Sequence, residues 1–126
     1  MEIQNIDHIV LTVADIEKTI SFYTDILGFE AVSFGDNRKA LAFGNQKISL
    51  HQKGNEFEPK ALHATPGSAD LCFIATTDVH DILKELKEKN IEIIEGIVIR
   101  TGATGKIRSV YFRDPDQNLI EVSNYI

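Results

Sequence analysis

Residues 6–30 have the sequence IDHIVLTVADIEKTISFYTDILGFE, in which a strand pattern passes directly into a helix pattern. Apolar residues first alternate with other residues, which predicts a half-buried strand over about residues 4–13. After Asp15, a good N-cap residue, apolar residues recur at helical spacing, and Gly28 then supplies a C-terminal stop. The segment therefore predicts a helix over residues 16–27.

The same order of patterns returns in the second half of the chain. Adding 62 to each position carries His8 to Asp70 and Gly28 to Asn90, and the apolar spacing between these two positions predicts a second helix over residues 78–89. Short segments rich in β-branched or aromatic residues predict the remaining strands at about 30–35, 39–44, 47–53, 69–76, 92–100, 107–113 and 119–125. The order β-α-β-β-β therefore occurs twice, as in an internal repeat.

The two copies are expected to form a single α+β domain with two βαβββ modules, at about residues 3–53 and 69–126. Residues 54–68 hold two of the three prolines and few apolar residues, which predicts a linker. The last strands of the two modules align with an offset of 70, which carries His51 to Glu121. The extra residues of the second module fall in a predicted long loop.

Composition excludes several classes of protein. With 126 residues, 43% of them hydrophobic and 25% charged, the chain has the size and composition of one folded domain. A net charge of −6 disfavours binding to nucleic acid or to anionic lipid surfaces. The lone cysteine, Cys72, cannot form an internal disulfide, and the N-terminus has no targeting pattern. We expect a cytoplasmic protein without membrane or nucleic-acid partners.

Four side chains of metal-ligating types fall on the less apolar faces of the predicted strands: His8, His51, Asp70 and Glu121. Taken singly, a histidine on a strand is usually a hydrogen-bonded or partly exposed residue. Four such residues at repeat-related positions favour a site for iron, manganese, nickel or zinc. Cys72 shares the face of Asp70, where a free cysteine is expected to behave as a small hydrophobic residue rather than a reactive thiol.

Three segments resemble the signature segments of the vicinal oxygen chelate superfamily, namely IDHIVLTV at 6–13, FYTDILGF at 22–29 and YFRDPDQNLIEV at 111–122. This superfamily includes glyoxalase I, extradiol dioxygenases, fosfomycin-resistance thiol transferases and bleomycin-resistance binding proteins. The resemblance implies two βαβββ modules that form a curled mixed sheet around a metal-containing cavity.

The resemblance also implies a ligand set. Metal ligands in the family lie on the first and last strands of each module, which here means His8, His51, Asp70 and Glu121. Asp70 departs from the family pattern, since glyoxalases and fosfomycin enzymes usually present a histidine there. The trio of His8, His51 and Glu121 would hold one divalent ion per site (Fe²⁺, Mn²⁺, Ni²⁺ or Zn²⁺), and in a glyoxalase-like reaction Glu121 would act as the catalytic residue that moves a proton.

Two classes of function follow from the resemblance. One is a metal-dependent enzyme, dioxygenase-like or of the lyase and isomerase type, that acts on a small molecule chelated through adjacent oxygens. The alternative is a non-catalytic protein that binds a drug or metabolite. A homodimer is expected, and the resemblance leaves open whether the ligands of one site come from one subunit or from both. Residues 53–68 and 101–106 are expected to act as lids, and Arg100, Lys106 and Arg108 are either solvated surface charges or contacts for an anionic group.

Overall fold

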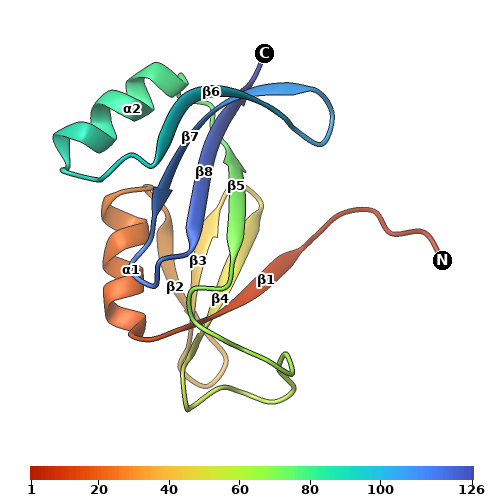
Figure 1. Ribbon diagram of the computed structural model, residues 1–126. Coiled ribbons are helices and arrows are strands. Elements are labelled where there is room, and N and C mark those ends of the chain that lie inside the picture. The colour runs from red at the N-terminus through yellow and green to blue at the C-terminus, as the bar shows by residue number, and fades with distance from the viewer. The chain divides into compact units, whose positions relative to one another are not determined.

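The computed structural model describes residues 1–126, which form two helices and eight strands (Figure 1). In chain order the elements are β1 (His8–Val13), α1 (Ile16–Asp25), β2 (Glu30–Phe34), β3 (Arg38–Phe43), β4 (Gln46–Gln52), β5 (Asp70–Ile74), α2 (Val79–Glu88), β6 (Glu95–Thr101), β7 (Lys106–Arg113) and β8 (Leu119–Tyr125). This is the predicted β-α-β-β-β order, present twice. Neither helix is long enough to cross a lipid bilayer.

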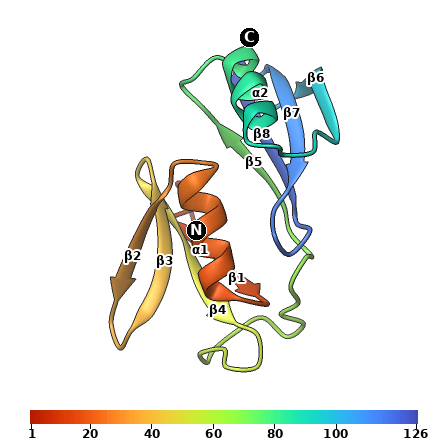
Figure 2. The ribbon, with the colours of Figure 1, turned by 90° about the vertical axis from the view of Figure 1, so that its left-hand side faces the viewer.

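The first compact unit is Met1–Gly67. Its four strands form a mixed sheet in the order β1-β4-β3-β2, in which β1 and β4 are parallel and the other pairs are antiparallel. Helix α1 packs on one face of this sheet, against β2, β3 and β4 (Figure 2). The opposite face carries the polar side chains of β1 and β4, because side chains alternate along a strand.

The second compact unit is Ser68–Ile126 and repeats this architecture. Its sheet has the order β5-β8-β7-β6, with β5 and β8 parallel. Helix α2 packs against β6, β7 and β8. The predicted α+β fold of two βαβββ modules is therefore confirmed, and each module forms its own four-stranded mixed sheet.

Each helix begins at an aspartate. The Asp15 side chain accepts a hydrogen bond from the Lys18 backbone N–H at 3.1 Å, and Asp78 accepts one from the His80 N–H at 2.8 Å. Such caps satisfy backbone donors that the first helical turn leaves unpaired. The second cap lies 63 residues after the first, whereas the first residues of β1 and β5 are 62 residues apart. The span from the start of β5 to its helix cap is therefore one residue longer than the span from the start of β1 to its helix cap.

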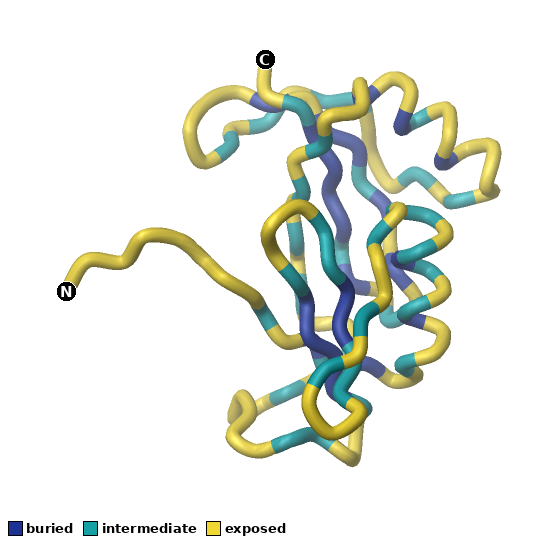
Figure 3. The backbone as a smooth tube through the Cα atoms, turned by 180° about the vertical axis from the view of Figure 1, so that it is seen from behind, coloured by how far each residue is buried: buried dark blue, intermediate teal, exposed yellow.

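The buried side chains lie between each helix and its sheet. Figure 3 shows that buried positions concentrate in the strands and on one side of each helix. The core side chains are Leu11, Val13, Tyr23, Leu41, Ile48 and Leu50 in the first unit, and Val79, Ile82, Leu86, Val110, Phe112, Ile120 and Val122 in the second. Both cores lie on the helix-facing side, so the polar face of each sheet is left for a site.

The strand register corrects the predicted alignment of the two modules. Val10 lies opposite Ser49 in the first sheet, and Cys72 lies opposite Glu121 in the second. Since Val10 and Cys72 are 62 positions apart, the structural counterpart of Glu121 is Ser49, at an offset of 72, and not His51 at an offset of 70. The error has a simple cause: the β7–β8 connection is longer than the β3–β4 turn, and strand spacing in sequence cannot show where pairing begins.

Candidate functional site

His8 is the first residue of β1. Its side chain is about half exposed (45%), and its Nδ1 atom lies 2.8 Å from a carboxylate oxygen of the neighbouring Asp7. A carboxylate on one imidazole nitrogen fixes the orientation of the ring and leaves the other nitrogen to bind a ligand. The start of β1 therefore presents an oriented Nε2 atom on the polar face of the first sheet.

His51 lies on β4 and is buried. Its ring contacts the Phe57 ring edge to face, with the centroids 5.6 Å apart. Both His51 and His8 line one cavity of about 280 Å³ in the first unit. His51 pairs with Thr12, four positions along β1 from His8, which places the two histidines roughly 13 Å apart along the strands.

The same cavity is rich in positive charge and aromatic rings. Its lining residues are His8, Val10, Phe34, Arg38, Lys47, Ser49, Leu50, His51, Phe57, Glu58 and Pro59. The Arg38 guanidinium lies 4.1 Å from the centre of the Phe57 ring, and the Lys47 Nζ atom lies 3.8 Å from the centre of the Phe34 ring. Sequence reasoning missed this cluster, because contacts between β2, β3 and the linker depend on the sheet pairing.

Glu121 is buried on β8, on the polar face of the second sheet. The Ser109 hydroxyl donates a hydrogen bond of 2.5 Å to Glu121 Oε2, and the Ser123 hydroxyl donates a longer one of 3.4 Å. The two hydroxyls are themselves 2.7 Å apart. The strand alternation had placed Ser123 beside Glu121, but Ser109 on β7 was not predicted, because its position opposite Ser123 depends on the antiparallel register.

Asp70 and Cys72 share β5, which runs beside β8. Asp70 is exposed at the start of the strand. Partial burial raises the pKa of the Cys72 thiol, and the nearby Glu121 and Asp70 carboxylates raise it further, against a smaller lowering by a hydrogen bond with Ser123. Cys72 is exposed rather than packed as a buried hydrophobic residue, and its raised pKa favours the neutral thiol over a reactive thiolate.

The cations near the 101–106 segment have partners of their own. Arg100 forms an ion pair of 3.0 Å with Glu95, and Lys106 Nζ donates a hydrogen bond of 2.9 Å to Thr101. The predicted contacts for an anionic group at Arg100 and Lys106 are thus already engaged within the second unit. They differ in this respect from Arg38 and Lys47, which take part in no salt bridge.

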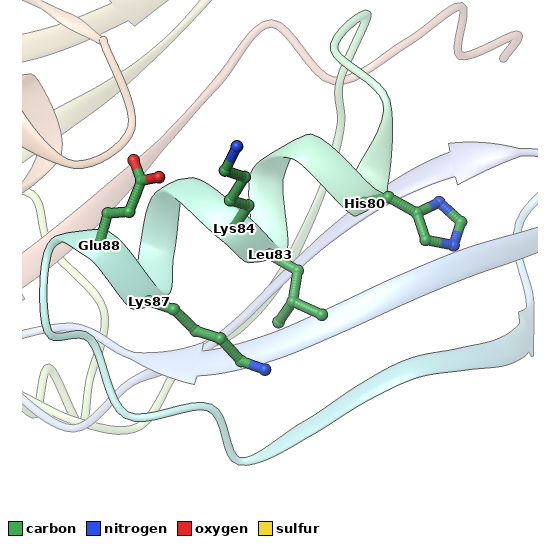
Figure 4. Close-up of a pocket in the computed structure, with 5 residues that line it drawn as sticks. All are labelled: His80, Leu83, Lys84, Lys87 and Glu88. Carbon is green, nitrogen blue, oxygen red and sulfur yellow. The ribbon is translucent and has the colours of Figure 1, made fainter.

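A second hollow runs along the outer face of α2. Figure 4 shows its lining side chains, which are His80, Leu83, Lys84, Lys87 and Glu88. His80 is exposed, and its Nδ1 lies 3.0 Å from the capping Asp78 carboxylate. This hollow is a solvated helix surface without a buried polar group.

The four predicted ligands divide between the units. His8 and His51 line the cavity of the first unit, and Asp70 and Glu121 lie on neighbouring strands of the second. Among the 126 described residues, no three His, Cys, Asp or Glu side chains are grouped so that they could hold one ion. The polar face of the first sheet carries imidazoles and cations, and that of the second sheet carries a hydroxyl-bonded carboxylate.

A doubled βαβββ module with imidazole and carboxylate groups on its polar sheet faces defines a known class of protein. The chain belongs to the glyoxalase/bleomycin resistance protein/dioxygenase superfamily, whose family model matches residues 5–122. The predicted family is therefore confirmed.

Individual relatives cover nearly the whole chain. A virulence protein of Salmonella typhimurium is 61% identical over 126 residues, which cover 100% of this chain and 88% of the relative, and its crystal structure superposes with a TM-score of 0.99 over 100% of both chains. A glyoxalase domain-containing protein of Mycosarcoma maydis is 56% identical over 99% of this chain and 70% of its own length. A metallothiol transferase of Staphylococcus epidermidis is 31% identical over 97% of this chain and 82% of its own length.

Proposed function

We propose that this protein is a metal-dependent enzyme that acts on a small molecule chelated through two adjacent oxygen atoms. Membership of the superfamily supports this proposal, as does the 31% identity to a protein named as a metallothiol transferase. The reaction type proposed is dioxygenase-like, or that of a glyoxalase-related lyase or isomerase. The single observation that carries the proposal is the state of the Glu121 carboxylate.

Glu121 is only 9% exposed and has no cationic partner in a salt bridge. Burying a carboxylate is costly unless a counter-charge or hydrogen bonds compensate. Its two hydroxyl donors, Ser109 and Ser123, both approach Oε2. Hydroxyls on one carboxylate oxygen are the kind of outer contact that orients a ligating carboxylate.

The donor set fits a divalent ion of the iron, manganese, nickel or zinc type. His8 and Glu121 are proposed as the principal ligands, since each is already oriented by a hydrogen-bonding partner. Asp70 and His51 are the proposed remaining ligands, although His51 lies roughly 13 Å along the strands from His8 and Ser49, not His51, is the structural counterpart of Glu121.

When bound, such an ion acts as a Lewis acid that stabilises negative charge developing on the chelated oxygens. The Glu121 carboxylate is proposed to accept or return a proton, while Ser109 and Ser123 hold its orientation. Burial, followed by the Glu121 carboxylate, raises the pKa of the nearby Tyr111 phenol. Tyr111 is therefore kept protonated and can donate a hydrogen bond on the same face.

The proposal is tested by metal analysis of protein purified without added metals, followed by a screen of catechols, thiol adducts of α-keto aldehydes, and fosfomycin. We expect close to one divalent ion per site and turnover that a chelator abolishes and metal restores. His80→Ala serves as the matched control, because this histidine lies on the exposed surface of α2. Tight binding of a compound to metal-free protein, with no turnover under any metal, would instead support the non-catalytic binding function.

A further inference from the structure

We propose that Arg38 and Lys47 form an anion-binding subsite in the cavity of the first unit, which takes the carboxylate or phosphate-type group of a small molecule. That this molecule is the substrate rests on the proposed function. The binding of the anionic group itself does not, because it needs no metal.

The two cations gather at one end of the cavity through a continuous series of contacts. Lys47 Nζ lies over the Phe34 ring, and Phe34 on β2 pairs directly with Arg38 on β3. The Arg38 guanidinium in turn lies over Phe57, whose ring contacts His51. Lys47 starts from β4 and therefore reaches across the sheet toward the β2 side, where Arg38 lies.

Small residues make room for this arrangement. Ala40 and Ala42 on β3 pair with Ser49 and Lys47 on β4, so they lie on the same face as the cavity. Their methyl groups leave space above the sheet for the Lys47 side chain and for a ligand. The hydroxyl of Ser49, which lines the cavity, adds a polar group to its floor.

The charge of the cavity is not neutralised from within. Neither Arg38 nor Lys47 forms a salt bridge, although the chain carries 19 acidic residues against 13 basic ones. The single acidic residue that lines the cavity, Glu58, is paired with Lys60. In an acidic protein, a concave surface with two unpaired cations and two histidines concentrates positive potential where a small anion can enter.

Packing against aromatic rings explains the positions of Arg38 and Lys47 less completely than an anion-binding site does. Cations on exposed aromatic rings occur as ordinary surface contacts, and they do not need to converge on a cavity. Here the ring contacts hold the long side chains in fixed positions while their N–H groups remain without carboxylate partners. A guanidinium held in this way presents a planar set of donors that matches the two oxygens of a carboxylate or phosphate group.

The subsite is tested by NMR titration of the full-length, chelator-treated protein labelled with nitrogen-15, at constant ionic strength. The probes are inorganic phosphate, malonate and, as a neutral molecule, glycerol. We expect saturable shifts of backbone signals in β3 and β4 with at least one of the two anions and none with glycerol. The anion that binds more tightly distinguishes a phosphate-type group from a carboxylate.

Arg38→Gln and Lys47→Gln should each weaken anion binding at least tenfold. Lys39→Gln is the matched control, since it removes the same charge from the same strand while its Nζ is bonded to Ser33 on the other face. Circular dichroism verifies that each variant is folded, and the charge-conserving Arg38→Lys and Lys47→Arg should retain part of the affinity.

Equal binding by the wild type and both glutamine variants would overturn the subsite, and so would an equal loss in the Lys39→Gln control. The outcome is separable from the proposed enzyme function. If the anion binds at this cavity but no metal-dependent turnover is found, the function fails and the subsite stands. If metal-dependent turnover is found and no anion binds, the proposed function stands and the subsite fails.

Discussion

The side chain of Asp7 gives His8 a defined orientation, and this contact makes a prediction at the residue scale. Asp7→Asn should lower metal affinity by roughly 10- to 100-fold, because it removes the carboxylate that orients the imidazole and raises its basicity. His8→Ala should abolish most of the metal content. Metal retained after dialysis against a graded chelator series measures both effects, and full retention by His8→Ala would place the site elsewhere.

Cys72 reports on the charge of Glu121. Since the Glu121 carboxylate helps to raise the pKa of the Cys72 thiol, Glu121→Gln should lower that pKa and increase the thiolate fraction at pH 8. Alkylation of Cys72 by iodoacetamide should then be faster in Glu121→Gln than in the wild type, with the difference vanishing at high pH, where both thiols are ionised. Glu88→Gln on α2 makes the same change of net charge and should leave the rate unaltered.

Sequence alternation was sufficient to place His8, His51 and Glu121 on polar strand faces, because side-chain direction has a period of two. It was not sufficient to identify the partners of these residues. The Ser109 contact to Glu121 and the Arg38 contact to Phe57 join segments that are distant in sequence. Both depend on the pairing register and on the path of the linker, neither of which leaves a local pattern.

At the scale of elements, Gly96 on β6 is a position that only glycine can fill. Its φ is +143°, and a Cβ atom there would lie 2.9 Å from the Val110 Cα atom. Gly96→Ala should therefore reduce the free energy of unfolding by about 1–3 kcal/mol or more. Gly44→Ala is the control, because Gly44 also has a positive φ of +52° but has open space around it.

Urea denaturation measures both glycine variants. A larger loss of unfolding free energy in Gly96→Ala than in Gly44→Ala isolates the contribution of the close approach to Val110. Equal losses would mean that backbone conformation alone accounts for the cost.

The 53–68 segment supplies part of the cavity wall through Phe57, Glu58 and Pro59. We predict that hydrogen exchange in this segment slows when a ligand occupies the cavity, as for a binding loop on a rigid scaffold. In the 101–106 segment the Gly102 N–H already donates to the Gly105 carbonyl at 2.7 Å. Hydrogen-exchange mass spectrometry with and without ligand compares the 53–68 and 101–106 segments. An unchanged exchange rate at 53–68 with ligand demonstrably bound would exclude a lid there.

Element order and type could be predicted because caps, apolar periodicity and turn residues act locally. Asp15 and Gly28, for example, bracket the first helix in the sequence and in the structure. Element limits were less accurate: β1 begins at His8, whereas the sequence predicted a start near residue 4. Residues 1–7 pair with no other strand, and they continue from β1 as an extended arm (Figure 1).

At the scale of the whole molecule, we predict a homodimer. Each four-stranded sheet has two edge strands, which natural proteins cover or protect. Val10, Ile74 and Ile99 are large apolar side chains that are 47%, 54% and 58% exposed, and burying them in a second copy would be favourable. Sedimentation velocity should give about twice the chain mass of 14.1 kDa. A single species of 14.1 kDa across a micromolar dilution series would contradict the dimer.

The strand register of the two sheets gives the two halves different functional groups at one equivalent position. One duplicated position now carries a hydroxyl at Ser49 and a carboxylate at Glu121, so the halves are no longer interchangeable. The polar faces of the two sheets therefore differ at this position, because a hydroxyl cannot take the place of a carboxylate as an anionic group. Ser49→Glu would put a carboxylate at both positions and would set an acid beside Lys47 on the cavity face of the first sheet.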